Sequence, residues 1–202
     1  MSRFRATAIL LLIISVARAQ HSGIGIKAGA VASRTKSGNN LTSAIPGAAA
    51  GIYFPLRAGP RMELQPELLI TSMGADHQLQ EGGRGSVRTI YVSLPVSLKM
   101  YIGNVFNAHA GFQMQRLLAA RQRGPDGTAT VTDSYAHWDY GVQLGLGADL
   151  VRGLDLGLRC YAGLSPIQTK GALMSPRNQA LMLSLGYRVS RLRAPKATLR
   201  RR

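Results

Sequence analysis

A strict two-residue alternation of side chains constrains the fold of this chain more than any other feature. It is clearest between Arg88 and Ile102. One face there carries Ile90, Val92, Leu94, Val96, Leu98, Met100 and Ile102, and the other carries Thr89, Tyr91, Ser93, Pro95, Ser97, Lys99 and Tyr101. Only a β-strand places successive side chains on opposite faces. The segment is therefore predicted to be a long strand rather than a helix.

The same alternation recurs along most of the chain, and no segment between the first 20 residues and the C-terminal tail has the period of a helix. We expect eight strands, at about 23–33, 47–56, 62–71, 88–102, 106–115, 138–150, 154–164 and 181–189. Pro66 and Pro95 cannot donate to a ladder, so a bulge is expected at each, and the two are expected to be neighbours. The pattern predicts an all-β fold.

The connections between these strands alternate strictly between short and long. Residues 57–60, 103–105 and 151–153 form tight hairpin turns, whereas 34–46, 75–87, 119–134 and 165–178 form loops of about a dozen residues. Neighbouring strands joined in this way run antiparallel. The prediction is an up-and-down meander with its short turns at one end and its long loops at the other.

The first 19 residues have the pattern of a secretory signal peptide. Arg3 and Arg5 precede an apolar run from Ala6 to Val16, and a small-residue cleavage site ends at Ala19. The apolar run is too short for a membrane anchor, which needs about 20 residues. We therefore expect export of the chain. Cys160 is the one cysteine and cannot form an internal disulfide.

The net charge of +16 is concentrated near the two ends of the chain. The signal peptide takes three positive charges with it, residues 188–202 carry +7, and the body from 20 to 187 is left with +6. We expect a barrel domain over 20–190 and a disordered basic tail over 191–202. The alternative is that the tail binds anionic lipid headgroups or cell-wall polymer from the periplasmic side. Export makes nucleic acid an unlikely partner, and none is expected.

Strand length distinguishes a membrane barrel from a soluble one. A tilted strand needs about 9 to 11 residues to cross the hydrocarbon layer, whereas soluble strands average about 5 or 6. The apolar faces, which include Cys160, carry no charge. The opposite faces hold Glu63, Glu67, Lys99, Asp139, Asp149, Asp155 and Arg159, which would point inward and pair with one another and with Arg61. We predict an eight-stranded antiparallel transmembrane β-barrel in a Gram-negative outer membrane.

Two further properties follow from this prediction. An eight-stranded barrel is just wide enough for side chains to fill, so an open diffusion pore is not expected. Aromatic belts are expected at the two membrane interfaces, with Phe54, Phe106 and Tyr187 near the short turns and Trp138 and Tyr140 near the loops.

Four segments resemble the PorT-like outer-membrane β-barrel family. These are Gly-Ile-Lys-Ala-Gly at 25–29, Leu-Gln-Pro-Glu-Leu at 64–68, Tyr-Val-Ser-Leu-Pro-Val-Ser-Leu-Lys at 91–99 and Leu-Ser-Leu-Gly-Tyr at 183–187. The resemblance implies an eight-stranded barrel with no catalytic residues and a structural or surface-interaction role. It leaves open an accessory role in secretion or assembly. Barrels of this kind commonly end on an aromatic residue. This chain departs from that pattern, because 15 residues follow Tyr187.

No catalytic, cofactor-binding or metal-binding residues are predicted. The remaining alternative is a lipid-modifying enzyme in which Ser134 and His137 act with Asp133 or Asp139, because nucleophilic catalysis needs a serine, a base and an orienting acid in contact. No hydrolase motif or metal-ligand spacing accompanies them. The expected partners are outer-membrane lipid and lipopolysaccharide, together with periplasmic or cell-surface proteins.

Overall fold

The computed structural model describes residues 23–37, 40–78, 84–124, 127–167 and 176–191. The predicted signal peptide at 1–19 lies outside these ranges. The predicted tail at 191–202 also lies outside them, except for Arg191. Within the described ranges, no helix is long and apolar enough to cross a membrane.

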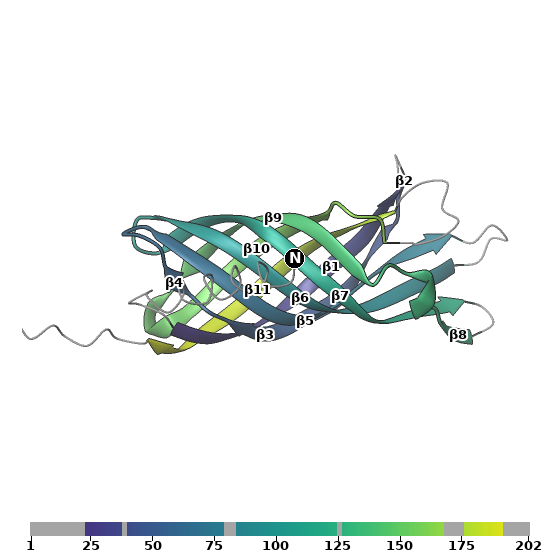
Figure 1. Ribbon diagram of the computed structural model, residues 1–202, viewed down its shortest axis with the longest axis horizontal. Helices are drawn as coiled ribbons and strands as arrows, with labels where there is room; N and C mark the ends of the chain where they lie inside the picture. The colour runs from purple at the N-terminus through teal and green to yellow at the C-terminus, as the bar shows by residue number, and fades with distance from the viewer. Residues whose placement is uncertain (1–22, 38–39, 79–83, 125–126, 168–175, 192–202) are drawn as a thin grey trace, which may run out of the picture.

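Eight long strands form a closed antiparallel barrel (Figure 1). They are β1 (Gly23–Ser37), β3 (Ser43–Tyr53), β5 (Met62–Gln78), β6 (Arg84–Ile102), β7 (Phe106–Gly124), β9 (Trp138–Asp149), β10 (Leu154–Gly163) and β11 (Arg177–Arg191). Each pairs with the next along the chain, and β11 pairs with β1 to close the ring. The predicted all-β fold, the meander and the strand count are confirmed.

The strands extend further into the predicted loops than the alternation indicated. β5 continues to Gln78, β6 begins at Arg84 and β7 continues to Gly124. Four short pieces lie beside them: β2 (Asn40–Leu41), β8 (Gly127–Thr130) and the 3-10 turn η1 (Thr132–Ser134) at the loop end, and β4 (Leu56–Arg57) at the other. The predicted loop boundaries were wrong because the ladder continues beyond the apolar zone, where both faces of a strand meet polar surroundings and alternation fades.

The three short connections lie together at the end opposite β2 and β8 (Figure 1). Two of them use left-handed backbone: Gly103 has a φ of 71°, and in η2 (Val151–Gly153) Arg152 and Gly153 have φ values of 62° and 88°. Glycine adopts this conformation at little cost, which explains its place in two of the turns. In outer-membrane barrels the short turns face the periplasm and the long loops face outward.

The barrel has polar side chains inside and apolar side chains outside. On β6, Ser93, Ser97 and Lys99 are at most 4% exposed, whereas Leu94 and Met100 are 42% and 57% exposed. The other long strands follow the same rule, and Cys160 lies on the outer face as predicted. An outer apolar surface of this kind suits contact with lipid.

Pro66 and Pro95, the two prolines expected to cause bulges, cause none. Pro66 lies opposite Val96, and the same register resumes at Leu69 and Ser93. The prediction that Pro66 and Pro95 are neighbours is therefore confirmed, but the prediction of a bulge at each was wrong. The ladder instead skips Glu67 and Leu68, the stretch that faces Pro95, so the missing donor is accommodated by a local gap and the register is kept.

Aromatic side chains mark both ends of the outer surface. Phe106 and Tyr187 are 66% and 45% exposed near the short turns, and Trp138 and Tyr140 are 43% and 39% exposed near the loops. Trp138 stacks on Tyr140 at 6.5 Å between ring centroids, and the guanidinium of Arg116 lies 5.8 Å from the Trp138 ring. These four positions agree with the two predicted belts. Phe54, which was also expected in the belt near the short turns, is half-buried rather than exposed.

Candidate functional site

The centre of the barrel holds a fully buried carboxylate. Glu67 on β5 has a side chain with no exposed surface, and it accepts hydrogen bonds from Lys27 at 2.7 Å and from Gln65 at 2.5 Å. The Arg159 guanidinium donates to both of its oxygens, at 2.9 and 2.7 Å. Two buried cations therefore pair with one buried anion, and removal of the anion would leave both cations without their partner.

A second cluster lies nearer the short turns and is organised by Asp149 at the end of β9. This carboxylate receives hydrogen bonds or ion pairs from Tyr101 at 2.8 Å, Asn107 at 3.0 Å, Arg188 at 3.3 Å and Lys99 at 3.7 Å. Arg188 also reaches Glu63 at 3.3 Å. The cluster therefore joins β5, β6, β7, β9 and β11 at one level of the barrel.

The space between the two clusters is almost completely filled. Tyr53 donates to Asp155 at 2.5 Å there, and a cavity of about 10 Å³ at this level is lined by Lys27, Lys99, His109, Asp155 and Arg159 among others. That volume has room for about one water molecule. Within the described residues, both ring nitrogens of His109 lack a protein partner, and they border this cavity.

The half of the interior nearest the loops is closed by a polar layer and an apolar plug. Asp139 accepts hydrogen bonds from Gln115 at 2.7 Å, Ser165 at 2.8 Å and Asn178 at 2.8 Å. Buried apolar and aromatic side chains pack in this half: Val31, Ala49, Leu69, Met73, Val87, Tyr91, Leu117, Ala120, Tyr135, Tyr161, Ile167 and Met182. Tyr135 and Ile167 come from connections between strands, and the Ala136 amide donates to the Ile167 carbonyl at 2.9 Å.

The structure confirms the inward position of the predicted charges and changes their pairing. Lys99 and Arg159 pair with acids as predicted, but Arg61 is exposed and has no ion pair with a described residue. Lys27 and Arg188 supply the other cations of the ion pairs. From the sequence, Lys27 was given no role and Arg188 was counted with the basic C-terminal residues. Strand parity could have found both, because each alternates with outward-facing apolar residues.

The residues of the enzymatic alternative are not assembled into a site. Asp133, Ser134 and His137 are exposed, whereas Asp139 is buried inside the barrel and bonded to other groups. Among the described residues, no three histidine, cysteine or acidic side chains are grouped so as to hold a metal ion.

Comparison with known proteins identifies the type of barrel. A family model of outer membrane protein beta-barrel domains matches residues 18–168. The fold is similar to Neisserial surface protein A of Neisseria, with a TM-score of 0.55 and 12% identity over 83% of this chain and 98% of that one. Ail of Yersinia pestis has a TM-score of 0.47 and 14% identity, over 84% and 98% of the chains. OprG of Pseudomonas aeruginosa has a TM-score of 0.43 and 10% identity, over 82% and 95%. No curated protein sequence matches the chain.

Proposed function

The chain belongs to the family of outer membrane protein β-barrel domains, and from this premise we propose that it is a closed, non-enzymatic barrel of PorT-like type with a structural or surface-interaction role. Its location in the outer membrane follows from the family and the fold. The proposal that the barrel is closed rests on how its interior is filled.

The observation that carries the proposal is the continuous filling of the barrel along its axis. Two ion-paired clusters, a polar layer around Asp139 and an apolar plug follow one another from the short turns to the loops. Passage of a solute would require separating Glu67 from Arg159 and Lys27, whose side chains are all buried. Leaving such a charge unpaired costs about 3–5 kcal/mol, which disfavours spontaneous opening.

The PorT-like type is supported by the position of the sequence segments that carry the resemblance. Lys27 of the first segment and Glu67 of the second form the central ion pair, and Lys99 at the end of the third reaches Asp149. Segments far apart in the chain thus supply charged groups to one interior network. This supports a shared structural purpose for the motifs.

A surface role is supported by the loop end of the molecule. β8 pairs with the end of β7 at the loop end of the barrel (Figure 1). All four of its residues are exposed. Such extensions offer polar backbone and side chains to a partner beyond the membrane. The absence of an assembled site at Ser134 and His137, within the described residues, supports the non-enzymatic reading.

The proposal is tested with purified, refolded full-length protein in liposomes. We expect no swelling in isosmotic sugar solutions, while a general porin incorporated at the same protein-to-lipid ratio gives rapid swelling. A variant with Lys27, Glu67 and Arg159 all changed to serine is the matched comparison for a widened interior. Sugar permeation through the wild-type barrel would overturn the proposal. Native folding of each sample is checked by the difference in gel migration between unheated and boiled protein.

A further inference from the structure

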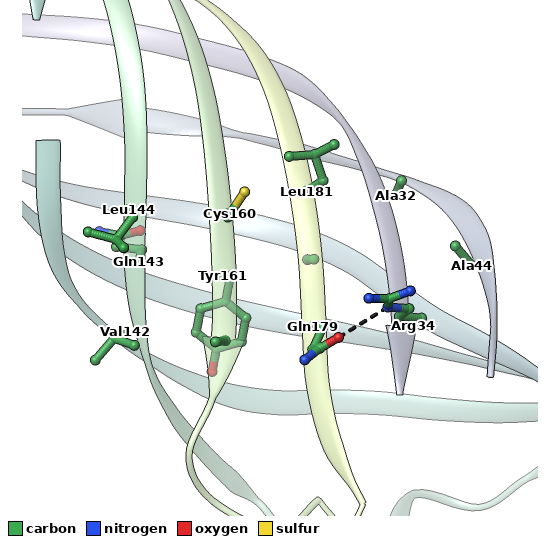
Figure 2. Close-up of a pocket in the computed structure, with 12 residues that line it drawn as sticks. Ala32, Arg34, Ala44, Val142, Gln143, Leu144, Cys160, Tyr161, Gln179 and Leu181 are labelled. Carbon is green, nitrogen blue, oxygen red and sulfur yellow. Dashed lines mark hydrogen bonds between the residues drawn. The ribbon is translucent and has the colours of Figure 1, made fainter. Parts of the chain in front are cut away.

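The outer surface of the barrel contains an apolar groove near the loop end, over β9, β10, β11, β1 and β3 (Figure 2). Its volume is about 520 Å³. Small side chains form the hollow, namely Ala32, Ala44, Cys160 and Ala162, while Val142, Leu144 and Leu181 form larger walls. The groove exists because small side chains on neighbouring strands share rows of the ladder with leucine and valine.

The ladder register shows how these residues are arranged. Leu144, Cys160, Leu181 and Ala32 form one row across four strands, and Val142, Ala162, Gln179 and Arg34 form the next row toward the loops. Arg34 closes the second row, where its Nε donates to the Gln179 side chain at 3.1 Å (Figure 2). The apolar groove therefore has a cation at its loop-side edge.

Two more cations lie one row further toward the loops. Lys36 on β1 is directly opposite Arg177 on β11, and both are exposed. Like charges at directly opposed positions of a ladder destabilise it unless something neutralises them. The outward-facing described residues of β1, β10 and β11 include no acid, and no described carboxylate is within ion-pair distance of these cations. Among the described residues, this pair of like charges therefore has no anionic partner, and an anion bound from outside would stabilise it.

The depth of this cluster in the membrane identifies the source of such an anion. Tyr140 lies two residues beyond Val142 toward the loops and belongs, with Trp138, to the aromatic belt at that end. Aromatic belts lie at the level of lipid headgroups. The strands are tilted, and the row of the ladder that leaves β1 at Ile26 returns to β1 at Lys36 after one turn, so a row rises toward the loops from β9 to β1. Arg34, Lys36 and Arg177 therefore lie at the level of the aromatic belt or beyond it on the loop side. The part of the groove at Leu144 and Cys160 lies on the membrane side of these cations.

We propose that this surface binds a phosphorylated glycolipid of the outer leaflet, of the lipid A type. An acyl chain lies in the groove over Cys160 and Ala162, and a sugar phosphate accepts hydrogen bonds from Arg34 and Arg177 with Lys36 beside them. Guanidinium groups suit phosphate because they donate two parallel hydrogen bonds. The site is independent of whether the barrel interior is closed.

The experiment measures lipid binding to the folded full-length protein by native mass spectrometry, with detergent-solubilised bisphosphorylated lipid A titrated against the same lipid lacking both phosphates. R34Q/R177Q removes the phosphate contacts. R61Q/R152Q removes the same charge from exposed residues near the short turns. A162L fills the groove without changing charge, and A110L makes the same change at an outward-facing site on β7 that is not part of the groove.

We expect one bisphosphorylated lipid per barrel and much weaker binding of the lipid without phosphates. R34Q/R177Q should weaken binding about thirtyfold, since each basic group at an anionic membrane surface contributes roughly fivefold. A162L should also weaken it, while R61Q/R152Q and A110L should not. Equal binding of both lipids or of phosphatidylethanolamine, equal effects of the two arginine pairs, or full binding by A162L would each overturn the proposal. The gel-migration assay excludes misfolding as a cause.

Discussion

The Arg159 guanidinium holds both carboxylate oxygens of Glu67 across the full width of the barrel. The two N–O distances are 2.9 and 2.7 Å. β5 and β10, which carry these residues, are four strands apart in either direction around the ring, so they lie on opposite walls. A bidentate pair has fixed geometry as well as strength. The interior is therefore braced along a diameter.

Loss of the Glu67 charge should destabilise the barrel strongly. E67Q leaves Lys27 and Arg159 buried without their anion, and breaking a buried pair in this way costs about 3–5 kcal/mol. The expected result is a lower midpoint in urea unfolding of the lipid-reconstituted protein. It should also lower the temperature at which gel migration changes from the folded to the unfolded position.

E63Q is the matched control for that substitution. Its partner Arg188 keeps Asp149 at 3.3 Å, and the Arg188 side chain is 18% exposed. The loss of stability should be smaller than for E67Q, because Arg188 keeps an anionic partner and the Glu63 side chain, at 10% exposed, is less completely buried than that of Glu67. Equal losses of stability for E67Q and E63Q would mean that the Glu67 ion pairs contribute no more to stability than the Glu63–Arg188 pair.

Two tyrosines provide a second matched comparison. Tyr53 is fully buried and donates to Asp155 at 2.5 Å, whereas Tyr101 donates to Asp149, which also contacts Lys99, Asn107 and Arg188. Y53F should cost about 1–3 kcal/mol because it removes a hydrogen bond to a buried acid. Y101F should cost less, since its acceptor keeps other partners. Urea unfolding of both variants checks this order, which a larger loss for Y101F would contradict.

A close approach of two strands makes Gly111 sensitive to substitution. A Cβ at this position on β7 would collide with the backbone of Val96 and Ser97 on β6, and backbone cannot move aside as a side chain can. G111A should lower the unfolding midpoint and the refolding yield. G124A is the control, because nothing lies within 4 Å of a Cβ there. Similar behaviour of the two variants would show that the strand contact is not tight.

Removal of His137 should leave the membrane lipids unchanged. The side chain is exposed, and the buried Asp139 is bonded to Gln115, Ser165 and Asn178. We expect cells producing H137A to show the same lipid A mass profile as cells producing the wild type. A species present only with the wild-type protein would support the lipid-modifying alternative. Equal amounts of folded protein in the outer membrane are confirmed by gel migration.

Strand parity made most of the fold predictable. Side chains such as Leu94 and Lys99 belong to opposite faces whatever their partners, because successive residues of a strand point in opposite directions. The same rule placed Cys160 outside and Glu67 inside. It failed at the loop ends, where β5, β6 and β7 continue without a clear apolar face, and at Pro66 and Pro95, where a gap in the ladder replaces the expected bulges.

The sequence by itself determined the number and direction of the strands, the side on which each residue lies and the outer-membrane class of the fold. Only the tertiary structure decided which charges meet, because the stagger of the strands around a closed barrel sets the height of each side chain. That stagger brings Lys27 and Arg159 to Glu67 and Arg188 to Asp149, while Arg61 stays exposed. It also brings small residues of separate strands together in the outer groove beside Arg34. These residues are far apart in the chain, so the sequence alone does not show that they meet.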